Sequence, residues 1–242
     1  AGLEAWGGSI ANMTGGSITG GAGGNQSELN PVYVAGGGGA GIVFRDGQTA
    51  SLDNAGTVSG GNGGIANSGS HGAGGVGIVG AASGGILIIN SGTIAGGLAG
   101  DGVTRANAVS LFGSNNRFEI RAGSTTNGNV VVQGGGTNNV LALGGTANGT
   151  VNIGNLVASH TGFTAYEKTG SSTWTLSGAG SQNWSIREGT LSGNSSSMAG
   201  DLTFDTGAGT RGVVFVQGTG GIYSRTISGD GNFTLARAAA SL

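Results

Sequence analysis

Short apolar runs, separated by glycine and asparagine, recur along the whole 242-residue chain. Within these runs apolar residues return at alternate positions over three to five residues, as Val130 and Val132 do. This two-residue alternation predicts short β-strands. No window keeps a 3.6-residue period, and dense glycine would cost a helix about 1 kcal/mol per residue relative to alanine. The pattern therefore predicts an all-β protein with many tight turns.

The chain also repeats itself. The phrase NAGTVSGG at residues 54–61 returns as NSGTIAGG at residues 90–97, which is 36 positions later. Such periodicity is typical of stacked supersecondary units, none of which buries its apolar face alone. The longer matching pairs are residues 41–64 with 77–100, residues 16–24 with 56–64, and residues 115–130 with 138–151.

Short strands joined by turns, at about 20 residues per repeat, describe a right-handed parallel β-helix of roughly nine coils. The 36-residue copies are then ordinary coils that carry a glycine-rich excursion, for example residues 60–75. In such a solenoid equivalent residues stack, so Val58 and Ile94 should occupy one internal column. Asn54 and Asn90, just before a turn, should hydrogen-bond to each other as a ladder.

The glycines of the repeated phrase need their own explanation. Gly56, Gly60 and Gly61, together with their copies, are expected to supply positive φ or close backbone approach at corners. Glycine makes up 58 of the 242 residues, with one proline and no cysteine. Collagen is excluded because the glycines keep no three-residue period along the chain and proline is nearly absent. Recurrent apolar runs and a charged fraction of only 8% do not fit disorder.

Charge and hydropathy exclude several classes of partner. The net charge is −2, so no basic surface suggests binding to nucleic acid. The longest apolar stretch, residues 84–89, is far shorter than the roughly 20 residues of a transmembrane helix. The sequence therefore predicts no nucleic-acid partner and no transmembrane segment within residues 1–242.

One motif resembles a nucleotide site in form only. Gly36, Gly38 and Gly41 spell G-x-G-x-x-G after a strand-like run. A dinucleotide site needs a helix next, whose N-terminus faces the pyrophosphate. Here a strand and a turn follow, and the same spacing returns 36 residues later at Gly72, Gly74 and Gly77. These glycines are interpreted as structural turns, and no cofactor is predicted.

Candidate catalytic and metal-binding residues are few. The two histidines, His71 and His160, stand far apart without cysteine, so no metal site is predicted and both are expected at the surface. Glycan-cleaving β-helix enzymes need clustered carboxylates. The one close pair, Asp201 and Asp205, would stand about 13 Å apart on an extended chain. Solvated surface is the preferred interpretation, and no catalytic residue is predicted.

Residues 166–193 have a different character. The order of residues in this segment resembles the passenger-associated repeat of Gram-negative autotransporters, the type V secretion family. Residues 225–236, RTISGDGNFTLA, are similar to the segment that commonly follows this repeat. The residues that carry the resemblance are Lys168, Gly170, Thr173, Trp174, Leu176 and Gly178, followed by Gly189, Thr190 and Leu191.

The resemblance implies a fragment of a secreted passenger, displayed on the cell surface of a Gram-negative bacterium or released from it. Its leader and membrane anchor are expected outside this segment. Residues 1–160 would be glycine-rich β-helix coils. Residues 161–242 would be C-terminal coils similar to the autochaperone-like region, which folds first and helps the remainder emerge.

The function implied by this resemblance is that of an adhesin or adhesin stalk, not an enzyme. Partners would be a host matrix protein, a cell-surface protein or glycan, or another passenger by self-association. Loops carry function on solenoids. The candidate contacts are therefore the excursions at residues 20–38 and 60–76, with Trp6, Tyr33 or Phe112. A carbohydrate-active β-helix enzyme and a purely structural spacer remain alternatives.

Overall fold

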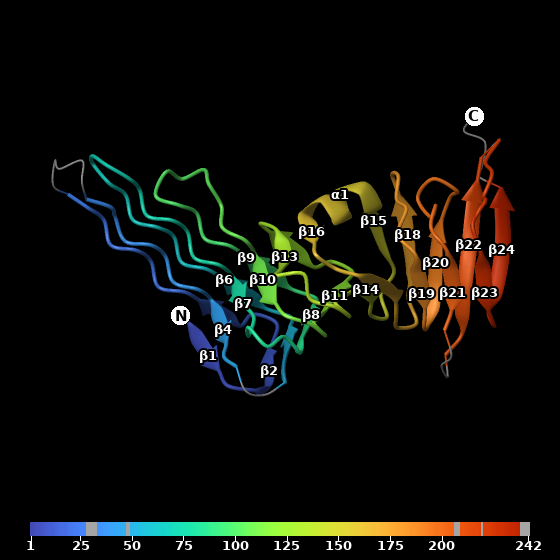
Figure 1. The fold of residues 1–242 in the computed structure, drawn as a ribbon, viewed down its shortest axis with the longest axis horizontal. Helices are drawn as coiled ribbons and strands as arrows, with labels where there is room; N and C mark the ends of the chain where they lie inside the picture. The colour runs from blue at the N-terminus through green and yellow to red at the C-terminus, as the bar shows by residue number, and fades with distance from the viewer. Residues whose placement is uncertain (28–32, 47–48, 206–208, 219, 238–242) are drawn as a thin grey trace. The chain divides into compact units, whose positions relative to one another are not determined.

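The computed structural model describes residues 1–27, 33–46, 49–205, 209–218 and 220–237 (Figure 1). Over these ranges the chain forms 24 short strands and one short helix. Named strands pair with parallel neighbours, in four sheets. Each strand pairs with its equivalent in the next repeat, which confirms a parallel β-solenoid of about nine coils.

The strands fall into the four sheets as follows. The first contains, in spatial order, β1 (Leu3–Ala5), β4 (Ile42–Phe44), β7 (Ile78–Val79), β10 (Val109–Phe112), β13 (Val130–Gln133) and β16 (His160–Thr161). The second contains β2 (Gly8–Asn12), β5 (Ala50–Asn54), β8 (Ile86–Asn90), β11 (Arg117–Arg121), β14 (Val140–Gly144), β17 (Ala165–Lys168), β19 (Trp184–Ile186), β21 (Leu202–Phe204) and β23 (Ile227–Gly229). The third contains β12 (Thr125–Asn127), β9 (Thr93–Ala95), β6 (Thr57–Ser59) and β3 (Ser17–Thr19). The fourth contains β15 (Gly149–Asn152), β18 (Thr173–Ser177), β20 (Gly189–Gly193), β22 (Arg211–Gln217) and β24 (Asn232–Arg237).

The chain divides into two compact units. The first comprises residues 1–118, 124–139 and 159–162, and the second comprises residues 119–123, 140–158 and 163–242. The first unit contains all of the first and third sheets, and the second contains all of the fourth.

The register of the first unit follows the repeats in the sequence. Ile18 pairs with Val58, and Val58 pairs with Ile94. Val58 and Ile94 are fully buried, so the predicted internal column is confirmed. The neighbouring Thr57 points outward, as strand alternation requires.

A ladder of buried asparagines crosses three coils of the first unit. The side-chain amide of Asn12 donates to Asn54 Oδ1 at 2.8 Å, and that of Asn54 donates to Asn90 Oδ1 at 2.8 Å. The ladder predicted for Asn54 and Asn90 is therefore confirmed, and Asn12 extends it. In the later, shorter repeats Asn116 donates to Asn139 Oδ1 at 2.9 Å in the same manner.

Two local features differ from the sequence-based expectations. A helix, α1 (Ile153–Ser159), stands where no helical period was evident, because seven residues with Ile153 and Leu156 buried are too few to show one. His160 is buried rather than at the surface. It pairs with the inward-facing Val130, so its side chain points inward, and its ring lies 5.7 Å from that of Phe118.

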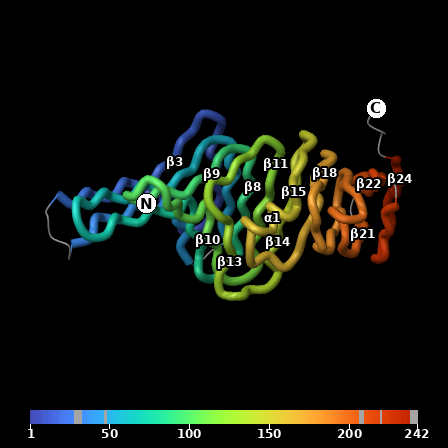
Figure 2. Tube along the Cα trace, turned by 90° about the horizontal axis from the view of Figure 1, so that it is seen from above, coloured from blue at the N-terminus to red at the C-terminus, as the bar shows by residue number. Residues whose placement is uncertain are grey.

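The glycine-rich excursions form a structure of their own, here called the glycine slab. Figures 1 and 2 show three excursions of the first unit lying side by side. Each excursion has an outgoing run and a returning run, and the described parts of these runs are extended but are not β-strands. The outgoing runs are residues 20–26, 60–66 and 96–100, and the returning runs are residues 34–41, 70–77 and 104–108.

Hydrogen bonds in the slab follow a three-residue period. The amides of Gly23 and Gln26 donate to Asn62 and Ile65 of the next outgoing run at 2.7 and 2.9 Å, and that of Gly20 donates to Ser59, just before this run, at 2.9 Å. In the second outgoing run, the amides of Gly61 and Gly64, also three residues apart, donate to the returning run of the first excursion, both at 2.8 Å. Three residues per turn without internal hydrogen bonds is the geometry of a polyproline II helix. The slab is therefore two hydrogen-bonded layers of such helices.

Only glycine fits where these runs touch. A Cβ atom on Gly61 would lie 2.0 Å from the carbonyl oxygen of Gly21 in the neighbouring outgoing run, and one on Gly60 would lie 1.9 Å from that of Gly75 in the returning layer. Neither Gly60 nor Gly61 has positive φ, so close approach is the reason for these glycines. Although the glycines keep no three-residue period along the whole chain, they do so locally within the excursions, as in residues 20–24 and 60–64.

Candidate functional site

The ends of the three excursions gather exposed apolar side chains, here called the tip. Its members are large, and each is at least half exposed. Exposed apolar residues scattered singly are normal, whereas these four stand at the ends of adjacent excursions. They are Tyr33 (51% exposed), Val34 (67%), Ile65 (53%) and Val103 (82%).

Backbone contacts hold the first two excursion ends in register. Gln26 forms a parallel bridge with Ala66, and Val34 forms one with Ser70. The amide of Ile65 donates to Asn25 Oδ1 at 2.9 Å. The tip therefore stands on the slab rather than on independent loops.

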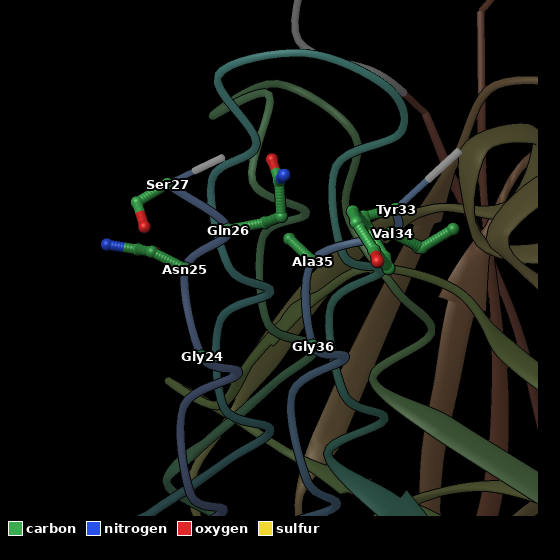
Figure 3. Close-up of a pocket in the computed structure, with 8 residues that line it drawn as sticks. All are labelled: Gly24, Asn25, Gln26, Ser27, Tyr33, Val34, Ala35 and Gly36. Atoms are coloured by element: carbon green, nitrogen blue, oxygen red, sulfur yellow. The ribbon is translucent and has the colours of Figure 1, made fainter. Parts of the chain in front are cut away.

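A pocket of about 480 Å³ opens within the first excursion end (Figure 3). One wall carries Asn25, Gln26 and Ser27 from the outgoing run, and the other carries Tyr33 and Val34 from the returning run. In Figure 3 the Gln26 side chain extends toward the returning run, whereas those of Asn25 and Ser27 point away from Tyr33 and Val34. Residues 28–32 of the predicted contact segment lie outside the described residues.

The third excursion end is fixed by Asp101. Its Oδ1 accepts from the amides of Val103 and Thr104, both at 2.8 Å, and its Oδ2 accepts from the Thr104 hydroxyl at 2.6 Å. These hydrogen bonds favour the charged carboxylate and hold the pKa of Asp101 below its usual value. The closed turn presents Val103 to solvent.

The other residues predicted as contacts stand apart from the tip. Trp6 is 69% exposed between β1 and β2, whereas Phe112, at the end of β10, is only partly exposed. The predicted contact segments, residues 20–38 and 60–76, include Tyr33, Val34 and Ile65, whereas Val103 lies outside them. Glycines spaced three residues apart flank the ends of the second and third excursions. This spacing is the sequence signal that locates Ile65 and Val103.

The glycine motif at Gly36, Gly38 and Gly41 lies in the first returning run and leads directly into the strand β4. Gly38 donates to the carbonyl of Ala73 at 2.8 Å, so its amide is engaged in the slab. This arrangement agrees with structural glycines, as the 36-residue repeat predicts. The element that follows the motif directly is the strand β4, not a helix that could face a pyrophosphate.

The carboxylate pair in the second unit flanks the strand β21. Asp201 Oδ1 accepts from the Thr226 amide at 3.0 Å, whereas Asp205 pairs with Arg187 at 3.2 Å. Arg187 also pairs with Glu167 at 2.9 Å. Asp201 and Asp205 therefore serve different contacts. Among the residues described, no cluster of three or more metal-ligating side chains is present.

The segment that resembles the passenger-associated repeat is organised around Lys168. This side chain is fully buried, and its ammonium donates to the carbonyls of Thr169 and Gly170 at 2.7 Å and of Glu188 at 3.0 Å. A Cβ on Gly189 would lie 2.6 Å from Lys168 Nζ, and Gly189 has a φ of 74°. These identities are therefore explained by packing.

Trp174 anchors the strand β18 to its neighbours. Its indole nitrogen donates to the Gly144 carbonyl at 3.0 Å, and its backbone pairs with the buried Leu191. A Cβ on Gly149 would lie 2.7 Å from the Trp174 ring, which fixes glycine at that place in β15. The tryptophan and the G-T-L residues thus belong to one packed layer.

Burial of Lys168 gives a testable pH dependence. Desolvation lowers the pKa of Lys168 to about 8, against the partly opposing charges of Glu188 and Glu119. The unfolded chain therefore binds more protons between about pH 8 and 10.5, so stability rises with pH across that window. We expect urea unfolding to show a gain of about 1–2 kcal/mol from pH 7.5 to 9.5, allowing for screening.

The variant Lys168→Met should remove this slope. Its unfolding free energy is expected to stay level over the same pH range, apart from changes shared with the native chain. An unchanged slope in Lys168→Met would show that another group titrates. Arg225→Met, a substitution of an exposed cation, serves as the matched control.

Among the described residues, no helix is long and apolar enough to cross a bilayer. Comparison of the chain with protein-family models, with curated proteins and with solved structures finds no match.

Proposed function

We propose that the chain is a surface-displayed passenger segment of a Gram-negative autotransporter, acting as an adhesin or as its stalk. The resemblance of residues 166–193 to the passenger-associated repeat supports this proposal. The parallel solenoid is compatible with it, because each coil offers open strand edges on which the next coil can form. Folding outside the cell could then draw the chain outward.

The observation that carries the adhesive role is the tip. Four exposed apolar side chains stand at the ends of three adjacent excursions. Backbone hydrogen bonds between the glycine-rich runs of the slab hold these excursions in place. Pre-ordering of a binding surface lowers the entropy lost on association. The proposed partners are a host matrix protein or a cell-surface protein or glycan, with self-association as a further possibility.

Substitution of the tip tests this role. In the triple variant Tyr33→Ser, Ile65→Ser and Val103→Ser, attachment of beads coated with the purified chain is expected to fall at least about tenfold, because each lost anchor at an interface typically contributes 1 kcal/mol or more. The readout is bead retention on fibronectin, laminin, collagen and cultured epithelial cells. Thermal unfolding should change little, because the three side chains are exposed.

Met13→Ser is the matched control, since Met13 is an exposed apolar residue outside the excursions. Its attachment should equal that of the native chain. If the triple variant attaches as well as the native chain, the tip is not the adhesive surface. If the native chain attaches to none of these surfaces, the spacer alternative is favoured.

A further inference from the structure

A second concave feature lies across the outgoing layer of the slab, near its base. This groove has a volume of about 320 Å³ and crosses three successive coils. Glycine backbone supplies much of its floor, so the hollow exists because side chains are missing there. Its lining residues are Thr19, Gly20, Ala22, Ser59, Gly60, Gly61, Asn62, Ala95, Gly96, Gly97 and Arg105.

Hydroxyl groups line one side of the groove. Thr19 pairs with Ser59 in register, and the Ser59 hydroxyl donates to Thr19 Oγ1 at 3.2 Å. The next position in this column is Ala95, which adds only a methyl group. The column therefore offers hydroxyl donors and acceptors beside an open floor.

Asn62 contributes an amide of known orientation. Its Oδ1 accepts from the Leu98 backbone amide at 2.9 Å, and because an N–H can only donate, the side-chain oxygen must face that group. Within the described chain no hydrogen bond engages Asn62 Nδ2. Two N–H donors are thus available to a ligand.

Arg105 supplies the charge. Its guanidinium donates from Nη1 to the Gly96 carbonyl at 2.5 Å, which tethers an exposed side chain at the groove. Arg45, Arg121 and Arg187 each pair with a glutamate. No carboxylate among the described residues pairs with Arg105, so its charge is uncompensated.

We propose that this groove binds the acid group of an anionic oligosaccharide. Arg105 takes the carboxylate or sulfate, for which its planar fork of donors is suited. Asn62 and the Thr19 and Ser59 hydroxyls hydrogen-bond to the sugar hydroxyls, and the glycine floor lets a ring approach closely. The volume is at the lower end for small-ligand sites, about that of one or two sugar rings.

The composition of the groove favours a saccharide over a peptide. It contains no aromatic or large aliphatic side chain to form the apolar anchor that peptide and protein partners usually fill. The inference rests on the proposed adhesive function, to which it adds a ligand class. The groove is nevertheless distinct from the tip, with which it shares no lining residue.

The test is titration of the full 242-residue chain, by calorimetry and by amide chemical shifts, with three probes. Sialyllactose presents a carboxylate, a heparin tetrasaccharide presents sulfates, and lactose is neutral. We expect an anionic probe to bind, weakening as salt rises, and lactose not to bind. The anionic probe that binds identifies the acid group. Shifts should centre on the amides of Gly96, Gly97 and Leu98.

Arg105→Gln should weaken binding at least about tenfold, since hydrogen bonds to charged groups contribute about 1.5–3 kcal/mol. Arg105→Lys keeps the charge without the fork, so an intermediate loss is expected. Ser59→Ala provides a second variant, with a smaller expected loss. The matched control is Arg225→Gln, because Arg225 is also exposed and donates to a backbone carbonyl, that of Ala199, at 3.2 Å.

Absence of binding to both anionic probes overturns the inference, as does lactose binding equally well. An equal loss in Arg225→Gln and Arg105→Gln would indicate charge attraction without a site and has the same consequence. Failure of the groove and failure of the adhesive function are separable. If the beads attach through the tip while no anionic probe binds, only the groove is wrong. If a probe binds while the beads attach nowhere, the adhesive proposal is wrong and the groove remains.

Discussion

Replacing Asn54 by leucine is expected to lower the free energy of unfolding by about 3–5 kcal/mol. Asn54 is fully buried at the centre of the ladder, where it accepts from Asn12 and donates to Asn90. Its amide also donates to the carbonyls of Gly56 and Thr93 at 3.3 and 3.2 Å. Leucine has a similar volume but satisfies none of these groups. Each buried polar group left without a partner costs about 1–3 kcal/mol.

Urea denaturation of the purified chain measures this effect. The matched control is Asp53→Ala, because Asp53 is the exposed neighbour of Asn54 on β5 and should change stability by no more than about 0.5 kcal/mol. A single hydrogen bond typically contributes about 1 kcal/mol. If the free energy of unfolding of Asn54→Leu lies within that amount of the native value, the ladder contributes little to stability. The expected result places the ladder among the main determinants of coil register.

The second large effect concerns the slab. Gly61→Ala is expected to push the second outgoing run away from the first, because the new methyl group would lie 2.0 Å from the carbonyl oxygen of Gly21 in that neighbouring run. Gly61 both donates to Gly39 and accepts from Gly75, each at 2.8 Å, so its displacement disrupts both contacts. We expect hydrogen exchange of the Gly39, Gly61 and Gly75 amides to accelerate at least about 100-fold, which corresponds to roughly 3 kcal/mol of local stability.

Gly21→Ala is the matched control. A Cβ on Gly21 meets nothing within 4 Å, and Gly21 does not have positive φ. Alanine there should be neutral or stabilising by about 0.4–1 kcal/mol, because it restricts the unfolded chain. The strand amides of Val58 and Ile94 should keep their protection in both variants. Similar exchange in Gly61→Ala and Gly21→Ala would contradict the close packing of the first two outgoing runs.

The parallel solenoid could be predicted because two signals agree. Apolar alternation indicated strands, and the 36-residue repeat placed Val58 over Ile94 and Asn54 over Asn90. Equivalent positions of a solenoid meet the same environment, so a repeat in sequence translates directly into register. His160 was misplaced because the short two-residue strand β16 has no neighbouring alternation to show which way it faces.

The slab could not be predicted in the same way. Its runs have no apolar face, so neither the strand nor the helix period applies. The spacing GGxGG at residues 20–24 and 60–64 does show a three-residue period. It does not show which runs become neighbours, because glycine has no side chain whose size or charge would select a partner. Arg105 and the groove were missed for that reason, since three runs must first be brought together.

The slab also divides its sequence into two classes of position. In the second outgoing run two residues of three face other backbones, as Gly60 and Gly61 do, while every third residue, such as Asn62 or Ile65, points to solvent. The glycines that face other backbones cannot be exchanged for a larger residue without forcing neighbouring runs apart. The solvent-facing positions are open to diversification at little risk to folding. During evolution, the solvent-facing third of these positions can therefore change, and with it the binding preference of the surface, while the backbone packing stays the same.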